Sequence, residues 1–301
     1  MRKIFITGSN GFVGLNLNKY LNKIHGIQLE NVSRNNLSNL DNNYFSNGDA
    51  IVHLAGKAHD LKKNSNPEEY YQVNFELTTK LYDAFLKSDS TKFIFVSSVK
   101  AAADSVDGIL TEEAIPTPLT DYGKSKLMAE RYIQEQPLPL GKSYYILRPC
   151  MIHGPGNKGN LNLLYKFVQK GIPYPLAAFE NKRSFLSIEN LCFVIASLLD
   201  KKIPSGIYHI ADDEALSTNE VVKILASSLA KKPKLWAIPS NLIYGLSKIG
   251  DILRLPLNTE RLNKLTENYI VSNTKIKEAL NLSLPITTKD GLLITANSFK
   301  N

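Results

Sequence analysis

Tyr122 and Lys126 stand four positions apart, and their side chains suit proton transfer. The surrounding segment 121–126 (DYGKSK) reads as the start of a helix, where residues four apart share one face. A free phenol has a pKa near 10, so at neutral pH its phenolate must be favoured by about 4 kcal/mol. A neighbouring ammonium group lowers a phenol pKa. Tyr122 is therefore the candidate acid–base group, with Lys126 as the residue that adjusts its pKa.

A second Tyr–Lys pair with the same spacing, Tyr244 and Lys248, shows that the spacing alone proves little in a chain with 14 tyrosines. What distinguishes the first pair is Ser98, which ends an expected strand 24 positions before Tyr122. Ligands of parallel sheets bind at the carboxyl ends of strands. We expect Ser98 to hydrogen-bond the substrate oxygen that gains or loses the proton, and we interpret the second pair as packing.

Three glycines follow the first expected strand, in the order Gly8, Gly11 and Gly14. The first permits a tight turn, the second lets backbone N–H groups approach a pyrophosphate, and the third lets the next helix pack on the sheet. Placed between a strand and a helix, this pattern predicts dinucleotide binding. The expected contacts also include the other turn residues, Asn10, Phe12 and Val13.

The end of the second expected strand bears on the choice of cofactor. An acid there favours NAD, whereas a basic residue accommodates the 2′-phosphate of NADP. Glu30 lies too early in the run, and Ser33 and Arg34 stand where the strand should end. We therefore expect NAD(P) with NADP favoured over NAD. The alternative is that Arg34 is only a surface side chain and the cofactor is NAD.

Short apolar runs alternate with helix-period segments along the first half of the chain, which predicts βαβ units and a parallel sheet. The expected strands are 3–7, 27–32, 50–55, 93–98, 143–147 and 206–210, and the expected helices are 12–24, 67–86, 121–136, 161–170, 188–199 and 217–229. The fold class is α/β, a doubly wound parallel sheet (Rossmann fold) with a smaller mixed C-terminal substrate lobe. We expect a dinucleotide-binding domain over 1–150, to which a strand and helix near 187–210 return. The substrate-binding lobe would comprise 151–186 and 211–301.

Composition excludes several other classes. The net charge of +8 is spread along the chain without a nucleic-acid-binding motif, and the histidines lack metal-ligand spacing, so we expect neither nucleic acid nor metal. The apolar run 192–199 is too short to span a bilayer. For the amphipathic segment 236–255 we favour packing in the second lobe over a membrane surface, and so expect no membrane insertion. Two cysteines and no signal peptide indicate a cytoplasmic protein.

Seven motifs together resemble the extended short-chain dehydrogenase/reductases, specifically the nucleotide-sugar epimerase/dehydratase/reductase branch. They are ITGSNGFVG (6–14), DAIVHLAGKAH (49–59), NPEEYYQVN (66–74), FIFVSSVK (93–100), TPLTDYGKSKLMAE (117–130), LRPCMIHGPGNKGN (147–160) and NKRSFLSIENL (181–191). The resemblance implies that Tyr122 is the acid/base, Lys126 the ribose anchor, and Ser98 the hydroxyl beside the sugar oxygen. It also implies two further sets of contacts. The cofactor would be bordered by Leu54, Ala55, Gly56, Asn74 and Pro149, and the substrate would be held by Lys100, Lys158, Asn160 and Arg183.

Two departures from the family pattern narrow the prediction. The segment 97–103 (SSVKAAA) replaces Ser-Ser-x-x-Val-Tyr-Gly and looks like the sub-branch of N-acetylated amino-sugar epimerases and 4-keto-sugar reductases. The acid expected at the end of the second strand is also missing, which weakens the case for a permanently held NAD. We therefore predict an NAD(P)-dependent reductase acting at C4 of a UDP- or dTDP-linked hexose, in polysaccharide precursor synthesis.

Two alternatives remain open. One is a 4-epimerase of a UDP-hexose or UDP-N-acetylhexosamine, and the other is a non-catalytic NADP-binding sensor or scaffold. A nucleotide-sugar substrate is the expected partner, and family members commonly form the homodimer that we also expect here.

Overall fold

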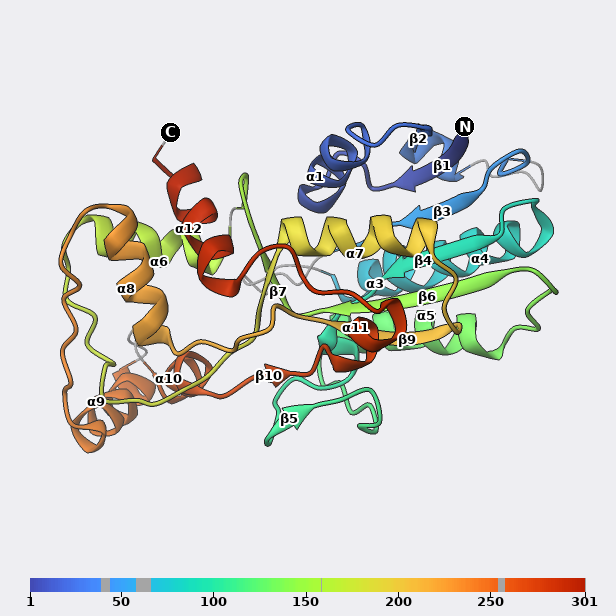
Figure 1. The fold of residues 1–301 in the computed structure, drawn as a ribbon. Helices are drawn as coiled ribbons and strands as arrows, with labels where there is room; N and C mark the ends of the chain where they lie inside the picture. Colours follow the sequence, from blue (N-terminus) through green and yellow to red (C-terminus); the bar gives the residue numbers. More distant parts are fainter. Residues whose placement is uncertain (39–43, 58–65, 158, 254–257, 301) are drawn as a thin grey trace.

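The computed structural model describes residues 1–38, 44–57, 66–157, 159–253 and 258–300, with only the backbone at Arg34 and Ser38. Its centre is a six-stranded sheet in the order β2-β1-β3-β4-β6-β9, in which every neighbouring pair is parallel. The strands are β1 (Arg2–Thr7), β2 (Ile27–Val32), β3 (Ala50–His53), β4 (Lys92–Val96), β6 (Ser143–Pro149) and β9 (Gly206–Ile210). The predicted Rossmann architecture is confirmed, including the late strand that pairs with β6 (Figure 1).

Helices cover both faces of this sheet, as buried parallel strands require. Alternate side chains of β1 point to opposite faces: Ile4 and Ile6 join a core with α1 (Phe12–Leu21), α7 (Ile188–Asp200) and α11 (Thr274–Leu280), whereas Phe5 joins another core. This other core holds residues of α4 (Leu77–Lys87) and α5 (Asp121–Glu135). The chain thus alternates faces, and the carboxyl ends of all six strands meet at one edge.

The segment 67–87 differs from the single helix that its apolar spacing predicts. It comprises α3 (Pro67–Tyr70), a π-helical stretch η1 (Tyr71–Glu76) and α4. π-helical turns widen a helix locally and are frequent at functional sites. Here the widened turn contains Asn74, one of the predicted cofactor contacts.

A further apolar cluster lies away from the sheet and is built from α6 (Asn160–Gln169), α8 (Thr218–Ser228), α9 (Ser240–Leu253), α10 (Thr259–Thr266) and α12 (Thr288–Ser298). In Figure 1 these helices occupy the end of the molecule opposite the N-terminus. The remaining elements are α2 (Arg34–Ser38), η2 (Val99–Ala101), β5 (Ile109–Leu110), β7 (Met151–His153), β8 (Phe185–Ser187) and β10 (Ile270–Val271). Two parallel pairs, β5 with β10 and β7 with β8, tie this part of the chain to the sheet region.

Candidate active site

The glycine turn after β1 is closed so tightly that side chains are sterically excluded from it. Gly8 has a φ of +70°, and a Cβ there would lie 2.6 Å from the backbone N of Ala55. A Cβ on Gly14 would lie 2.4 Å from the carbonyl oxygen of Gly8. The turn is therefore pressed against the end of β3, with the exposed Asn10 and Gly11 at its outer side.

Helix α1 begins directly after this turn, with Gly11 as its N-cap and no side chain capping it. The backbone N–H groups of its first turn, at Phe12, Val13 and Gly14, can therefore donate hydrogen bonds to an anion at the positive end of the helix. The cradle fits the pyrophosphate of a dinucleotide. When bound, such a cofactor would supply hydride chemistry at the carboxyl edge of the sheet.

Gly56, Asn74 and Lys126 lie next to one another, although they come from three separate segments of the sequence. A Cβ on Gly56 would lie 3.0 Å from Asn74 Oδ1 and 3.1 Å from Lys126 Nζ. Asn74 is fully buried, accepts from Lys57 N at 2.8 Å and donates to Ser125 Oγ at 3.1 Å. The structure thus brings together three of the predicted residues and fixes Asn74 between β3 and α5.

Tyr122 is positioned next to Ser98 by the start of α5. Thr120 caps this helix by accepting a hydrogen bond from Gly123 N. Gly123 lets the helix approach η2, because a Cβ there would lie 2.4 Å from the carbonyl oxygen of Lys100. The Tyr122 phenol is hydrogen-bonded to Ser98, whose Oγ also accepts from Lys100 N at 3.2 Å. The predicted serine–tyrosine pair is thereby assembled.

The electrostatic surroundings of Tyr122 keep its phenol protonated in the chain by itself. Burial raises its pKa, the hydrogen bond from Ser98 lowers it, and the charge of Glu130 raises it further. Lys126 Nζ donates to Val96 O at 3.1 Å, and burial lowers the pKa of Lys126 to about 8. In the chain without a bound cofactor, the Tyr122 phenol is therefore a weaker acid than a free tyrosine.

Beneath the candidate site lies a buried polar network that sequence reasoning missed. Glu130 is fully buried, and Arg148 donates to it from Nε at 3.1 Å and from the terminal nitrogen at 2.5 Å. Ser97 Oγ donates a short hydrogen bond to the same carboxylate. Glu130 lies one helical turn after Lys126 and raises the pKa of both Lys126 and Tyr122. The motif TPLTDYGKSKLMAE contained this glutamate, but its partners are remote in sequence.

His53 is part of the scaffold. Its ring lies between Thr7 Oγ1 at 2.7 Å and Thr78 Oγ1 at 2.9 Å, and burial lowers its pKa to about 3. The imidazole is therefore neutral and joins β1 to α4. Within the described ranges, no group of three histidine, cysteine, aspartate or glutamate side chains is arranged to hold a metal ion.

The predicted substrate residues are spread over several elements. Lys100 Nζ lies 4.3 Å from the centre of the Tyr269 ring, and Tyr269 forms a β-bridge with Arg183. Arg183 is engaged by the Glu267 carboxylate at 3.2 Å, and burial lowers its pKa. Tyr269 and Glu267 gave no signal in the sequence because they belong to no recognised motif.

The other predicted contacts are placed less centrally or fall outside the described residues. Asn160 is exposed as the first residue of α6, and Pro149 is buried at the end of β6. The backbone of Arg34 begins α2, directly after β2. Lys158 and the side chain of Arg34 lie outside the described part of the structure.

The fold and the glycine turn are typical of dinucleotide-dependent enzymes. The sequence model of the NAD dependent epimerase/dehydratase family matches residues 4–211. A UDP-glucose 4-epimerase from Vibrio cholerae is 30% identical over 319 residues, covering 99% of this chain and 95% of that protein. A UDP-2-acetamido-2,6-beta-L-arabino-hexul-4-ose reductase from Pseudomonas aeruginosa is 30% identical over 211 residues, or 68% of this chain and 51% of that protein.

Among solved structures, RMD from Pseudomonas aeruginosa complexed with NADPH superposes with a TM-score of 0.75 at 21% identity, covering 100% of this chain and 99% of that one. This similarity shows the shared fold. Together with the family match, it means that the chain belongs to the NAD-dependent epimerase/dehydratase family. It is an NAD(P)-dependent enzyme of the extended short-chain dehydrogenase/reductase type.

Proposed function

We propose that the protein is an NADP-dependent reductase of a 4-keto sugar carried on a nucleoside diphosphate, UDP or dTDP. A bound reduced nicotinamide cofactor would supply the hydride for the sugar C4. Tyr122 donates its phenolic proton to the carbonyl oxygen, which becomes a hydroxyl, and then regains a proton from solvent. Ser98 positions that oxygen by a hydrogen bond, and the Lys126 ammonium anchors the ribose and limits the negative charge left on Tyr122.

The observation that carries this proposal lies at the end of β2. Glu30, the acidic residue of this strand, forms an ion pair with Lys3 Nζ at 2.7 Å and is paired in register with Phe5. It lies two positions before the strand end, where Ser33 and Arg34 follow Val32. The sequence therefore has a serine and an arginine after this strand in place of the acid that would bind an adenosine ribose, a residue pattern that suits a 2′-phosphate.

The acetamido-hexulose reductase among the relatives supports an acetamido or 6-deoxy sugar as the substrate. For the nucleotide diphosphate we propose Lys100, Lys158, Asn160 and Arg183, with the cluster around α6 and α8 forming the substrate lobe.

Incubation with NADPH and a panel of UDP- and dTDP-4-keto sugars tests this proposal. We expect stoichiometric loss of absorbance from the reduced nicotinamide and a 4-hydroxy product detected by mass spectrometry. The Vibrio cholerae relative favours the second candidate, a UDP-hexose 4-epimerase. Tightly held NAD in the purified protein, with interconversion of UDP-sugars and no net oxidation of NADPH, would support that candidate instead. Cofactor binding without any turnover would indicate a sensor.

Ser33→Asp is expected to reverse the cofactor preference. A carboxylate at the end of β2 repels a 2′-phosphate and accepts hydrogen bonds from a free ribose 2′-hydroxyl, so the KM for NADPH should rise at least about tenfold relative to that for NADH. Glu30→Gln is the matched control, because Glu30 pairs with Lys3 and should leave the preference unchanged. An unchanged ratio in Ser33→Asp would contradict the proposed ribose site.

A further inference from the structure

Helix α9 presents an apolar stripe to solvent. Leu242, Leu246, Ile249 and Leu253 are 49–62% exposed, and their spacing of four, three and four residues places them on one helix face. The adjacent face, with Ile243, Ser247 and Gly250, is buried, and Ile243 belongs to the apolar cluster formed with α6, α8, α10 and α12. The amphipathic pattern of 236–255 predicted a helix packed in the second lobe, but only one face of this helix is packed.

The segment that leads into α9 has an exposed aromatic side chain of its own and adds positive charge. Trp236, the single tryptophan of the chain, is 58% exposed. Lys231, Lys232 and Lys234 precede it and are exposed as well. In Figure 1 this connection from α8 to α9 runs along the left end of the molecule, the end farthest from the N-terminus. Tryptophan and lysine beside an apolar helix face are typical of surfaces at a membrane interface.

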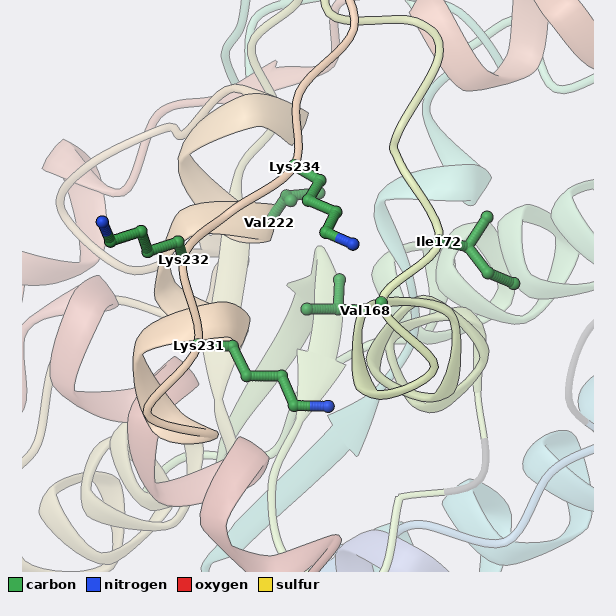
Figure 2. A pocket seen from close by; sticks show the side chains of 7 residues that line it. Val168, Ile172, Val222, Lys231, Lys232 and Lys234 are labelled. Atoms are coloured by element: carbon green, nitrogen blue, oxygen red, sulfur yellow. The ribbon is translucent and has the colours of Figure 1, made fainter.

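Two of these lysines direct their amines into a shared hollow of about 300 Å³ (Figure 2). Lys231 and Lys234 point toward the space between the segment and the end of α6. Val168 and Ile172 are among the apolar residues that line this hollow. Lys231 Nζ donates to the carbonyl oxygen of Gln169 at 2.5 Å, which leaves two of its three donors for another acceptor. Lys232 points away from the hollow. The arrangement suits an anionic head group with an apolar neighbour.

Negative charge is sparse on the same surface. The segment 231–253 contains four lysines and one acid, Asp251, whose carboxylate accepts from the backbone and hydroxyl of Thr259. In α10, Glu260 forms an ion pair with Lys264. The net charge facing an approaching partner is therefore positive, which selects an anionic surface.

We propose that the lobe-end surface, defined as the exposed stripe of α9 with Trp236 and Lys231, Lys232 and Lys234, docks the protein onto an anionic phospholipid bilayer. The stripe would lie at the boundary between head groups and acyl chains, while the lysines bind lipid phosphates. None of the described helices has the length and apolarity needed to cross a bilayer. The contact is therefore peripheral, and it is independent of the proposed sugar chemistry.

Sedimentation of the full chain with vesicles tests this inference. We expect binding to vesicles that contain phosphatidylglycerol, a blue shift of the Trp236 emission, and loss of binding to pure phosphatidylcholine or in about 1 M salt, where charges are screened within about 3 Å. The variant Lys231→Gln/Lys232→Gln/Lys234→Gln should bind the vesicles about 100-fold more weakly. The reason is that each lysine near an anionic membrane surface contributes a similar amount to the binding free energy. Leu246→Glu should weaken binding at least about tenfold.

Leu140→Glu is the matched control, because Leu140 is fully exposed before β6 and lies outside the lobe-end surface. It should bind vesicles as the unchanged protein does. All variants should retain the solution activity of the unchanged protein, which separates failure of docking from failure of the site. Absence of binding to anionic vesicles would overturn the inference. So would a dimer that Leu246→Glu dissociates without any vesicle binding, because the stripe would then be an interface between two copies.

Discussion

Tyr122→Phe is expected to slow keto-sugar reduction by at least about 10²-fold while leaving the affinity for NADPH nearly unchanged. The substitution removes the proton donor but keeps the aromatic ring, which packs edge-on against Tyr70 with 6.1 Å between ring centres. Without the hydroxyl, Ser98 alone cannot supply a proton of suitable acidity to the developing alkoxide. Single-turnover kinetics with preformed NADPH complex, together with fluorescence titration of the cofactor, would measure both quantities.

The chain provides its own control for this experiment. Tyr244→Phe alters the other Tyr–Lys pair of identical spacing, which lies on α9 where Tyr244 contacts Phe179. This variant should keep full activity. If Tyr122→Phe also keeps full activity, the assignment of the proton donor is wrong.

The strands of the sheet were predictable because their signals are local. Each is a short apolar run bounded by glycine, proline or a polar turn, and β2 begins and ends at the expected residues. The glycine turn was predictable for the same reason, since steric demands at Gly8 and Gly14 act within one turn of chain. Recognition of seven motifs added the roles of Ser98, Tyr122 and Lys126, which spacing alone did not distinguish from the pair on α9.

Features that depend on contacts between distant segments were not predictable. The π-helical turn around Asn74 has the same apolar spacing as a regular helix, and only its bonds to Lys57 and Ser125 show why the widened turn matters. The exposed apolar face of α9 was not predictable, because the apolar pattern of an amphipathic helix does not show which of its apolar side chains are buried against other elements. The raised pKa of Tyr122 likewise follows from burial, which the motif does not encode.

Glu130→Gln is expected to destabilise the fold by about 3–5 kcal/mol, because it leaves Arg148 buried without its counter-charge. The side chains are 0% and 1% exposed, so water cannot replace the lost partner. The double variant Glu130→Leu/Arg148→Met should lose much less stability, since removing both charges avoids the unpaired ion. Urea unfolding of the two variants and the unchanged chain would give the comparison.

The pH dependence of NADPH affinity tests whether Glu130 also adjusts the charge of Lys126 or only stabilises the fold. Glu130 raises the pKa of Lys126, which stands at about 8 in the intact chain. Removing its charge should lower that pKa, so the ammonium that anchors the ribose would be lost at a lower pH. NADPH affinity of Glu130→Gln, measured against pH below its unfolding limit, should therefore fall earlier as pH rises, and the double variant Glu130→Leu/Arg148→Met, which also lacks the carboxylate, should show the same shift. Coincident transitions in all three proteins would mean that the buried pair supports the fold only. A shifted transition would show that the carboxylate beneath α5 also sets the charge of the lysine beside the reacting oxygen.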